Sequence, residues 1–311
     1  MKRIIIMTVV IISIPFFVVN YWNDEDSNDG LSEIKLKYLS SQVVRVKRSG
    51  GEIENMSLEE YVIGVVAGEM PASFEMEALK AQSVASRTYV LKKINDSKNS
   101  DYDVVDTVSD QVFLDEEELM AKWGYNYTKY INKVRGAVND TFMEYLEYDG
   151  DIITAMYFST SNGYTEDSGV IFQKSLPYLK SVESIWDERV SSAFYTSTSI
   201  SLQEFYERLG LGYSNDLDVD ILEKSSSDRV IKLKINGVEF MAKDVYSKLG
   251  LRSYDFEFVR VGSNVLINTK GYGHGVGLSQ YGAQGMAKEG YNYQDILNHY
   301  YVGTELVKYD P

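Results

Sequence analysis

The sequence predicts an α+β fold of mixed helices and short strands that follows an N-terminal transmembrane helix. Three observations support this prediction. An apolar run opens the chain from Ile4 to Val19, residues 74–94 place small and apolar side chains at helical spacing, and residues 142–148 alternate as a strand does. The candidate functional motifs lie far apart along the chain, so we expect two lobes that flank a substrate cleft.

The N-terminal run has the charge pattern of a membrane anchor. Lys2 and Arg3 precede it and acidic residues follow it from Asp24 onward, which predicts an N-terminus inside the cell and a remainder outside. The run is close to the minimum length of a spanning helix, so it also fits the core of a signal peptide. Residues 18–22 are bulky and offer no small-residue cleavage site. We therefore favour an uncleaved single-pass anchor in the cell membrane.

The length of the chain, 311 residues, allows one large domain or two smaller ones. We assign residues 1–22 to the anchor, 23–33 to a polar acidic linker and 34–311 to an extracytoplasmic domain. Residues 185–262 are more varied in pattern and are a possible smaller subdomain.

The composition excludes several classes of function. The net charge of −15 argues against nucleic acid as a partner, because phosphate binding needs clustered Lys and Arg. Cysteine is absent, which excludes disulfides, thiolate metal sites and a cysteine nucleophile. Tyrosine is abundant at 25 residues. Buried tyrosines often belong to a hydrophobic core, whereas tyrosines exposed in a cleft would suit stacking on sugar rings.

The first elements are a strand and a helix. A strand is predicted within 34–46 and a turn at 49–51. Ser57-Leu58-Glu59-Glu60 matches a capping box, in which the first and last side chains satisfy each other's backbone amides. The helix that begins there should end at or near Met70, because Pro71 disfavours helical geometry in the residue before it.

This boundary places Glu69 in the last turn of the helix. The carbonyl dipoles at a helix C-terminus disfavour a carboxylate, so we expect the pKa of Glu69 to be raised. A carboxyl group that keeps its proton near neutral pH suits general acid catalysis. The common alternative is a surface glutamate at a helix end.

A second helix is predicted over 74–94. Gln82 and Ser86 lie four residues apart, as do Ser83 and Arg87, so polar groups lie on neighbouring faces of an otherwise small and apolar helix. Gln82 and Arg87 are candidates to face a cleft, and a solvated stripe is the alternative. An Arg87 within about 4–6 Å of Glu69 would lower the pKa of that carboxyl and oppose the helix-end effect.

The remaining elements follow from periodicity and turn residues. We expect further helices at 116–139, 202–209, 241–249, 280–289 and 293–300, and strands at 142–148, 152–158, 230–235, 256–261 and 264–268. The first two of these strands should pair across a turn at 148–151.

The segment from Gly271 to Gly282 combines many glycines with a histidine, a glutamine and a tyrosine. Glycine permits positive φ and close approach of the backbone, so this density indicates a shaped loop. His274 is one of two histidines in the chain. It is either a site group or a solvated residue in a glycine-rich turn.

Several of these motifs together resemble the stage II sporulation protein D family. The resemblance rests on Leu58 to Pro71, Glu77 to Tyr89, Ser109 to Phe113, Met156 to Asp167, Gly250 to Ser253, Gly271 to Tyr281 and Ile296 to Tyr301. It covers nearly everything after the linker, and its two long motifs, at 58–89 and 271–281, are specific.

The resemblance implies a lytic transglycosylase that cleaves peptidoglycan glycan strands already stripped of stem peptides by a partner amidase. Cleavage falls between N-acetylmuramic acid and N-acetylglucosamine and leaves a 1,6-anhydro end. The implied process is forespore engulfment during sporulation. The implied partners are peptidoglycan, a peptidoglycan amidase and a multi-pass membrane protein of the engulfment machinery. Relatives that enhance autolysins imply an alternative, a non-catalytic peptidoglycan-binding amidase enhancer.

The resemblance also assigns roles to residues. Glu69 matches the catalytic glutamate of the family, and a lytic transglycosylase needs one carboxyl group where ordinary glycosidases need two. Polar family positions expected to bind substrate or orient Glu69 are Gln82, Arg87, Gln111, Ser159, Ser161, His274, Gln280 and Tyr281. About half of such residues serve instead as structural hydrogen-bonding groups. We expect the glycine-rich loop to form the wall of the cleft opposite Glu69, where its glycines let a glycan chain approach closely.

Some members of the family bind zinc through a cysteine and a histidine near the Ser159-Thr160-Ser161 segment. This chain has Phe158 where a histidine is often found, and it has no cysteine. His274 and His299 are too few for a tetrahedral structural site without other ligands. We therefore expect no metal and no cofactor.

Overall fold

A computed structural model describes residues 42–172 and 174–308, and the chain from Val44 onward forms a compact unit. The fold is α+β, as the sequence predicts. The predicted anchor at 1–22 lies outside the described residues. Among the residues that the structure does describe, no helix has the length and apolar character needed to span a membrane.

Helix α3 (Leu58–Glu69) begins and ends where its capping and breaking residues predict. The hydroxyl of Ser57 accepts from the Glu60 amide, and the Glu60 carboxylate accepts from the Ser57 amide, so the capping box is complete. At the other end Met70 leaves the helical conformation directly before Pro71. The predicted boundaries of this helix are therefore confirmed.

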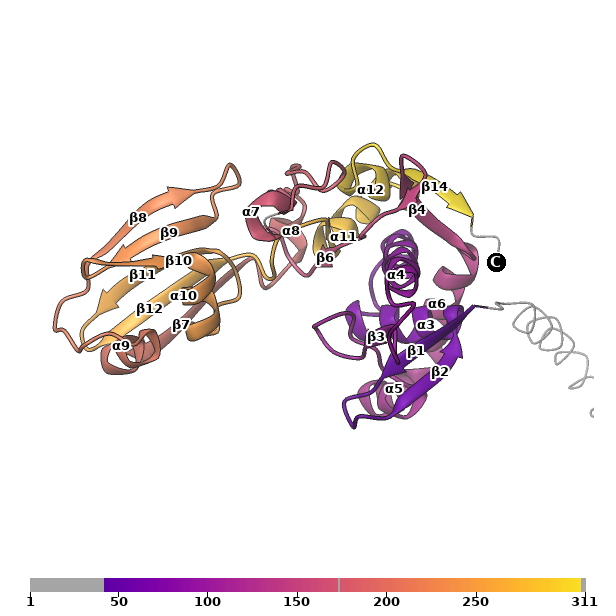
Figure 1. The fold of residues 1–311 in the computed structure, drawn as a ribbon, viewed down its shortest axis with the longest axis horizontal. Coiled ribbons are helices and arrows are strands. Elements are labelled where there is room, and N and C mark those ends of the chain that lie inside the picture. The colour runs from indigo at the N-terminus through magenta and orange to yellow at the C-terminus, as the bar shows by residue number, and fades with distance from the viewer. Residues whose placement is uncertain (1–41, 173, 309–311) are drawn as a thin grey trace, which may run out of the picture. The chain divides into compact units, whose positions relative to one another are not determined.

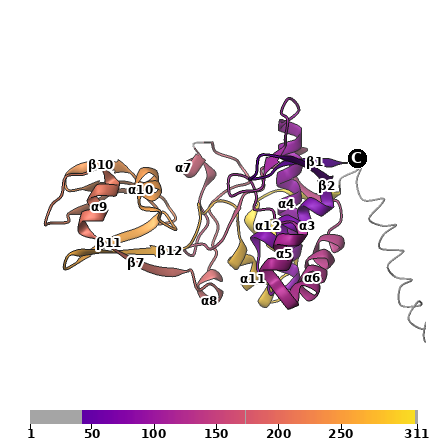
Figure 2. The same ribbon diagram turned by 90° about the horizontal axis from the view of Figure 1, so that it is seen from below.

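Helix α4 (Met76–Asp96) runs through the first hydrophobic core. It contacts α3, α6, α11, α12 and strand β4, which Figure 1 shows gathered around it, and Figure 2 shows the four helices from below. Ala78, Ala81 and Ala85 are fully buried on α4. Their small side chains let the neighbouring helices approach closely, as the sequence predicts.

The helix expected at 116–139 is divided, so that prediction is wrong in part. The segment forms α5 (Glu116–Trp123), a short 3-10 turn at Gly124–Asn126 and α6 (Tyr127–Asp140). Gly124 has φ 52° and ψ −128°, a conformation that no helix continues through. The apolar side chains on each side of this break still pack on the same core.

Small sheets complete the first core. One joins β1 (Val43–Lys47), β2 (Ile53–Ser57) and β3 (Val104–Val105), and another joins β4 (Glu144–Tyr148), β5 (Asp151–Ile152) and β14 (Glu305–Lys308). Residues 144–152 form the expected hairpin, with Asp149 and Gly150 at positive φ in its turn. The predicted strand 152–158 does not continue in that hairpin. Its end is a separate strand, β6 (Tyr157–Phe158), which pairs in parallel with β13 (Leu278–Ser279).

A second hydrophobic cluster is formed by buried residues between Leu202 and Ile267. Its sheets are β7 (Tyr195–Ser201) with β11 (Asp255–Val261) and β12 (Asn264–Lys270), and β8 (Val219–Lys224) with β9 (Val230–Ile235) and β10 (Val238–Met241). Helices α9 (Leu202–Leu209) and α10 (Ala242–Leu249) pack with these strands (Figure 1). The subdomain boundaries at 185 and 262, and the two lobes around a cleft, stay predictions.

The glycine-rich loop contacts residues 156–166 along its length. Isolated bridges join Thr160 with Tyr272 and Glu166 with Val276. A Cβ atom at Gly277, where φ is 82°, would lie 2.0 Å from the Met156 carbonyl oxygen. At this position the close approach that glycine permits is therefore made by the protein's own backbone, where we had expected a glycan chain.

Short and C-terminal helices surround this loop. They are α7 (Ser168–Phe172), α8 (Asp187–Val190), α11 (Gln280–Lys288) and α12 (Tyr293–Tyr300). The last two agree with the predicted helices at 280–289 and 293–300.

Candidate active site around Glu69

Glu69 is the last residue of α3, and its side chain turns toward the loop that follows β3. Its Oε1 accepts a hydrogen bond of 2.8 Å from the Val112 amide. Its Oε2 lies 3.4 Å from the Nε2 of Gln280, the first residue of α11. The carboxyl group is therefore held by segments that are distant from it in the sequence.

Gly68 allows the loop to lie close enough for this contact. A Cβ atom at position 68 would stand 2.5 Å from the Val112 carbonyl oxygen. The ring of the next residue, Phe113, stacks on Tyr61 of α3 with centroids 5.6 Å apart. The loop is thus packed against the helix that carries Glu69.

The pKa of Glu69 is raised, and burial of the carboxyl group is the main cause. Hydrogen bonds from the Val112 amide, Gln280 and Tyr157 oppose the rise, as does the positive charge of Lys122. The direction agrees with the sequence-based expectation, but its cause is different. Lys122 donates to the carbonyls of Ala67 and Gly68 at 3.0 and 3.3 Å, so a cation offsets the helix-end dipole.

Two glutamines adjoin the carboxyl group from the α4 and α11 sides. Gln280 Nε2 lies 3.4 Å from Gln82 Oε1, and Gln82 Nε2 donates to the Ser86 hydroxyl at 2.9 Å. Gln82 and Ser86 are fully buried and Gln280 is nearly so. The polar face predicted for α4 therefore meets the N-terminus of α11 beside Glu69.

Gln111 and Tyr157 complete the polar network. The Tyr61 hydroxyl donates to Gln111 Oε1 at 3.2 Å, and Gln111 Nε2 donates to the Tyr157 hydroxyl at 3.0 Å. Tyr157 in turn lowers the pKa of the Glu69 carboxyl group. The structure thus brings four predicted residues into one network: Glu69, Gln82, Gln111 and Gln280.

Sequence reasoning missed Tyr157, Tyr61 and Lys122. Tyr157 lies in an alternating segment beside the hydroxyl-rich turn, which was the one signal that could have found it among 25 tyrosines. Tyr61 matched the pattern of a core residue, and Lys122 that of a solvated helix surface. Tyr61 lies on the same helix as Glu69, whereas the proximity of Lys122 and Tyr157 to Glu69 depends on contacts across 40 or more positions, such as that from Lys122 to Ala67.

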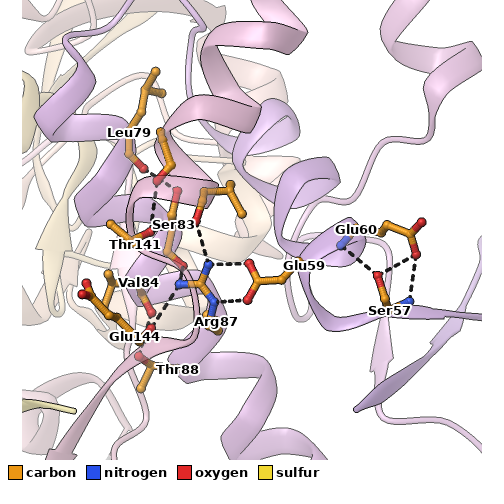
Figure 3. A network of polar contacts seen from close by, with 12 residues as sticks. Ser57, Glu59, Glu60, Leu79, Ser83, Val84, Arg87, Thr88, Thr141 and Glu144 are labelled. Atoms are coloured by element: carbon orange, nitrogen blue, oxygen red, sulfur yellow. Dashed lines mark hydrogen bonds and ion pairs between the residues drawn. The ribbon is translucent and has the colours of Figure 1, made fainter. Parts of the chain in front are cut away.

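Arg87 lies elsewhere, and this corrects the expectation that it faces a cleft or acts on Glu69. Its guanidinium group is fully buried and forms two hydrogen bonds to the Glu59 carboxylate, at 2.7 and 2.6 Å (Figure 3). It also donates to the Glu144 carbonyl at 3.1 Å. This placement gives Arg87 a structural role at the N-terminal end of α3.

The two serines predicted as site residues, Ser159 and Ser161, differ in their burial and hydrogen bonds. Ser161 is fully buried, its amide donates to Asp187 at 2.8 Å and its hydroxyl donates to the Ser184 carbonyl. It is therefore a structural hydrogen-bonding residue here. Ser159 is half-buried, and its carbonyl accepts from the Tyr281 amide at 3.0 Å.

Tyr281 is half-buried next to Gln280. Its ring meets the edge of Phe74 with centroids 5.0 Å apart. Ser159 and Tyr281 therefore adjoin the Glu69 network through Gln280, and their predicted contact with substrate stays a prediction.

His274 packs between aromatic rings. Its centroid lies 5.8 Å from that of Phe158 and 5.5 Å from that of Phe172, and its Nδ1 accepts from the Val276 amide at 3.0 Å. Burial, followed by the positive charge of Arg229, lowers the pKa of His274 to about 4, while a hydrogen bond to the Tyr157 backbone opposes this shift. His274 is neutral near pH 7 and contacts the strand that presents Tyr157.

Residues 42–172 and 174–308 contain no group of three or more His, Asp or Glu side chains placed to hold a metal ion. His299 instead bonds the Glu183 carbonyl at 2.7 Å. Phe158, at the position where a histidine is often found in the family, packs its ring against His274. The absence of a metal stays a prediction.

Comparison with known proteins matches one family model and several related proteins. A family model described as "Stage II sporulation protein" matches residues 47–148. Stage II sporulation protein D of Bacillus amyloliquefaciens is 40% identical over 286 residues, which cover 90% of this chain and 82% of that protein. The protein of the same name from Bacillus subtilis (strain 168) is 40% identical over 291 residues, which cover 91% and 83%. A Bacillus subtilis (strain 168) protein named "Amidase enhancer" is 31% identical over 300 residues, which cover 79% of this chain and 40% of that protein.

Proposed function

Because this chain belongs to the stage II sporulation protein D family, we propose that it is a peptidoglycan lytic transglycosylase of sporulation. Its substrate is the peptide-stripped glycan strand, cut between N-acetylmuramic acid and N-acetylglucosamine in forespore engulfment. The observation that carries the proposal is the Glu69 carboxyl group. Burial raises its pKa, and donors from two separate segments, at Val112 and Gln280, contact it.

The reaction uses this one carboxyl group twice. In its protonated form Glu69 gives a proton to the glycosidic oxygen, and the bond from that oxygen to C1 of N-acetylmuramic acid breaks. The resulting carboxylate then accepts the proton of the C6 hydroxyl while that oxygen attacks C1. The ring closes as a 1,6-anhydro sugar, no water is consumed, and Glu69 is protonated again. The second carboxylate of ordinary glycosidases is unnecessary, because the sugar supplies the nucleophile.

The Val112 amide and the Tyr157 hydroxyl support the second step. The amide donates to a carboxyl oxygen at 2.8 Å and Tyr157 lowers the pKa of the group, so both stabilise the anion that forms between proton donation and proton return. Burial favours the protonated starting state. Together the two effects give Glu69 a pKa above that of an exposed glutamate and below that of a buried glutamate without hydrogen-bond donors. A residue that acts first as an acid and then as a base needs such an intermediate pKa.

The test is digestion of peptide-free glycan strands with the full chain, followed by detection of anhydro-sugar ends. Glu69→Gln is expected to lower their release by about 100-fold or more, the usual contribution of general acid–base catalysis. His274→Ala is expected to lower it less, because His274 contacts Tyr157 only at its backbone and does not contact Glu69. Glu117→Gln, at an exposed position of α5, is the matched control. Equal release by wild type and Glu69→Gln would refute the mechanism.

The alternative is a non-catalytic enhancer of an amidase. The relative named "Amidase enhancer" favours it, while the intact carboxyl group at position 69 favours the enzyme. If wild type produces no anhydro ends but stimulates a peptidoglycan amidase on intact peptidoglycan, and Glu69→Gln stimulates it equally, the enhancer is correct.

Membrane attachment and partners belong to the same proposal. Residues 1–22 hold the chain in the cell membrane with its main domain outside, near the amidase and a multi-pass membrane protein of the engulfment machinery. The charge asymmetry around the apolar run supports this orientation. Protease added to intact cells should digest the domain, and complete protection of the domain would refute the orientation.

A further inference from the structure

Asp187 carries a buried carboxyl group that the proposed reaction does not use. It is the first residue of α8, and its side chain is fully buried. Its Oδ1 accepts hydrogen bonds from the Ser161 amide at 2.8 Å and from the Ser279 hydroxyl at 2.5 Å. Its Oδ2 accepts from the Ser184 hydroxyl at 2.7 Å. Three donors therefore satisfy one carboxyl group that is enclosed in the first core.

Ser279 connects this carboxyl group to helix α11. It is the N-cap residue of α11, and its hydroxyl oxygen accepts from the Gly282 amide at 3.3 Å. A hydroxyl group has one proton to donate. That proton goes to Asp187 Oδ1 at 2.5 Å, since the other acceptor within reach, the Ser159 carbonyl, lies 3.5 Å away. Asp187 therefore fixes the side chain that caps α11.

The first turn of α11 is also packed directly on this group. A Cβ atom at Gly282 would lie 2.0 Å from the Tyr300 hydroxyl, 2.5 Å from Ser184 Oγ and 2.7 Å from Asp187 Oδ2. Tyr300 and Ser184 lie 2.7 Å apart, and because the Ser184 proton is used at Asp187, Tyr300 donates in this contact. The turn is thus already as close to Asp187 as sterics allow, and the hydrogen bond from Ser279 opposes movement away.

Gln280 is the first residue of α11, so the position of this turn decides where its side chain reaches. Its Nε2 lies 3.4 Å from Glu69 Oε2 and 3.4 Å from Gln82 Oε1. An amide nitrogen has two protons and can donate to both oxygens at once. Both distances are near the outer limit for a hydrogen bond, so a small shift of the turn away from Glu69 would break the contact.

We propose that Asp187 is a positioning residue that fixes the start of α11 through Ser279 and thereby holds Gln280 against the Glu69 carboxyl group. This role deepens the proposed function and rests on it for its catalytic meaning. Asp187 acts on Glu69 only through Ser279 and Gln280. Ser161 was expected from the sequence to bind substrate or orient Glu69, and its amide has an indirect part in the second role as the other donor to Asp187 Oδ1.

The experiment measures kcat and KM of glycan cleavage by the full chain in detergent micelles. Gln280→Met removes a donor to the carboxyl group and should lower kcat by about ten-fold, the lower end of the effect of a hydrogen bond to a charged group, because the contact is long. Asp187→Ala frees the start of α11 and should lower kcat by about three- to ten-fold. Its KM should stay at the wild-type value, because a fully buried side chain does not touch the glycan.

Double variants test the path from Asp187 to Glu69. In a Gln280→Met background, Asp187→Ala should cause no further fall in kcat. Ser279→Ala breaks the same link from its other end, and its effect should not add to that of Asp187→Ala. Because it removes only one capping side chain, it also tests the link if Asp187→Ala does not fold. Single variants that leave kcat unchanged, or that lower it equally with and without Gln280, overturn the proposal.

Asp187→Asn is the conservative variant. Its side-chain oxygen can occupy the Oδ1 position and accept from Ser161 and Ser279, while its nitrogen faces the Ser184 hydroxyl. It should therefore retain most of the wild-type kcat that Asp187→Ala loses. A kcat as low as that of Asp187→Ala would contradict a role that depends on the acceptor at Oδ1.

A readout without turnover is the side-chain amide of Gln280 in ¹⁵N NMR spectra, assigned with Gln280→Met. Glu69→Gln should shift these signals in the wild-type background and should no longer do so in Asp187→Ala, where the contact is lost. Glu188→Gln, at the exposed neighbouring position of α8, is the matched control and should leave kcat and the signals unchanged. An inactive wild type would refute the proposed function alone, while Gln280 signals that respond fully to Glu69→Gln in Asp187→Ala refute the positioning role alone.

Discussion

Glu69 is held in surroundings that favour its protonated form, and this has a cost for the folded protein. Burial disfavours the carboxylate more than the Val112 amide, Gln280, Tyr157 and Lys122 together favour it, so the pKa is raised. At pH values between the pKa of Glu69 in the unfolded chain and its raised pKa in the folded chain, the folded chain binds more protons than the unfolded chain. Its stability therefore falls as pH rises through that window.

Glu69→Gln should consequently stabilise the protein in a pH-dependent manner. The gain in free energy of unfolding over wild type should be small below the ordinary glutamate pKa, grow as pH rises through the raised pKa, and then level off. Urea unfolding at acidic, intermediate and neutral pH measures this. Glu117→Gln should show no such trend because its side chain is exposed. A gain for Glu69→Gln that is equal at every pH would contradict the raised pKa.

For a single residue, the sequence predicts its position in the structure where a local rule, such as helix capping, applies to that residue. Pro71 and the capping box place Glu69 at the end of α3 without any knowledge of the fold. No local rule marks Tyr157, whose importance comes from its parallel pairing with a strand that lies more than 100 positions later. The direction of the Glu69 pKa shift was predictable, but its burial was not.

Helix α3 is the element that sets the site, and its two ends have different functions. The N-terminal end is fixed by the buried ion pair between Glu59 and Arg87 of α4, with N to O distances of 2.6 and 2.7 Å (Figure 3). The C-terminal end presents Glu69. Because Glu59 and Glu69 belong to α3 while Arg87 and Gln82 belong to α4, the ion pair helps to fix the distance from Glu69 to Gln82.

Arg87→Met is expected to lower the free energy of unfolding by about 3–5 kcal/mol, since it leaves the Glu59 carboxylate buried and unpaired. Replacing both partners, with Glu59→Leu added, should restore most of this loss. Urea unfolding of the single and double variants measures both values. A variant Arg87→Met with unchanged stability but a higher KM for glycan strands would instead show that Arg87 binds substrate.

The elements themselves were largely predictable where capping residues and periodicity agree, as for α3, α4, α9, α11 and α12. The predicted helix at 116–139 failed at Gly124, because apolar periodicity continues across the break while the backbone does not. The predicted strand at 152–158 failed because alternation cannot reveal that its two ends pair with different partners.

Across the whole described chain, the second cluster is joined to the glycine-rich loop by a buried cation. Arg229 is 2% exposed, donates to the Ser227 hydroxyl at 2.7 Å and to the Tyr164 carbonyl at 3.0 Å, and packs against Gly275. Its charge contributes to the low pKa of His274. Sequence patterns predicted the strands of this cluster but not the contacts of Arg229, of which the one to the Tyr164 carbonyl joins positions 65 residues apart.

Arg229→Gln should therefore raise the pKa of His274 above its value of about 4, because it removes a like charge that disfavours the imidazolium. NMR titration of the imidazole measures this, with His299→Gln to assign the second histidine. Arg260→Gln, at a more exposed arginine of the same cluster, is the control. An unchanged His274 titration in a folded Arg229→Gln protein would show that burial alone sets the pKa.

The contact between Glu69 and Gln280 spans 211 positions of the chain. A growing polypeptide therefore carries its glutamate long before it has the tyrosine and the amide that surround that glutamate in the folded protein. The acid acquires its complete environment only when the last helices have been synthesised and have docked on α4. If Glu69 cleaves glycan as proposed, this order of synthesis would delay its activity until the chain is nearly complete.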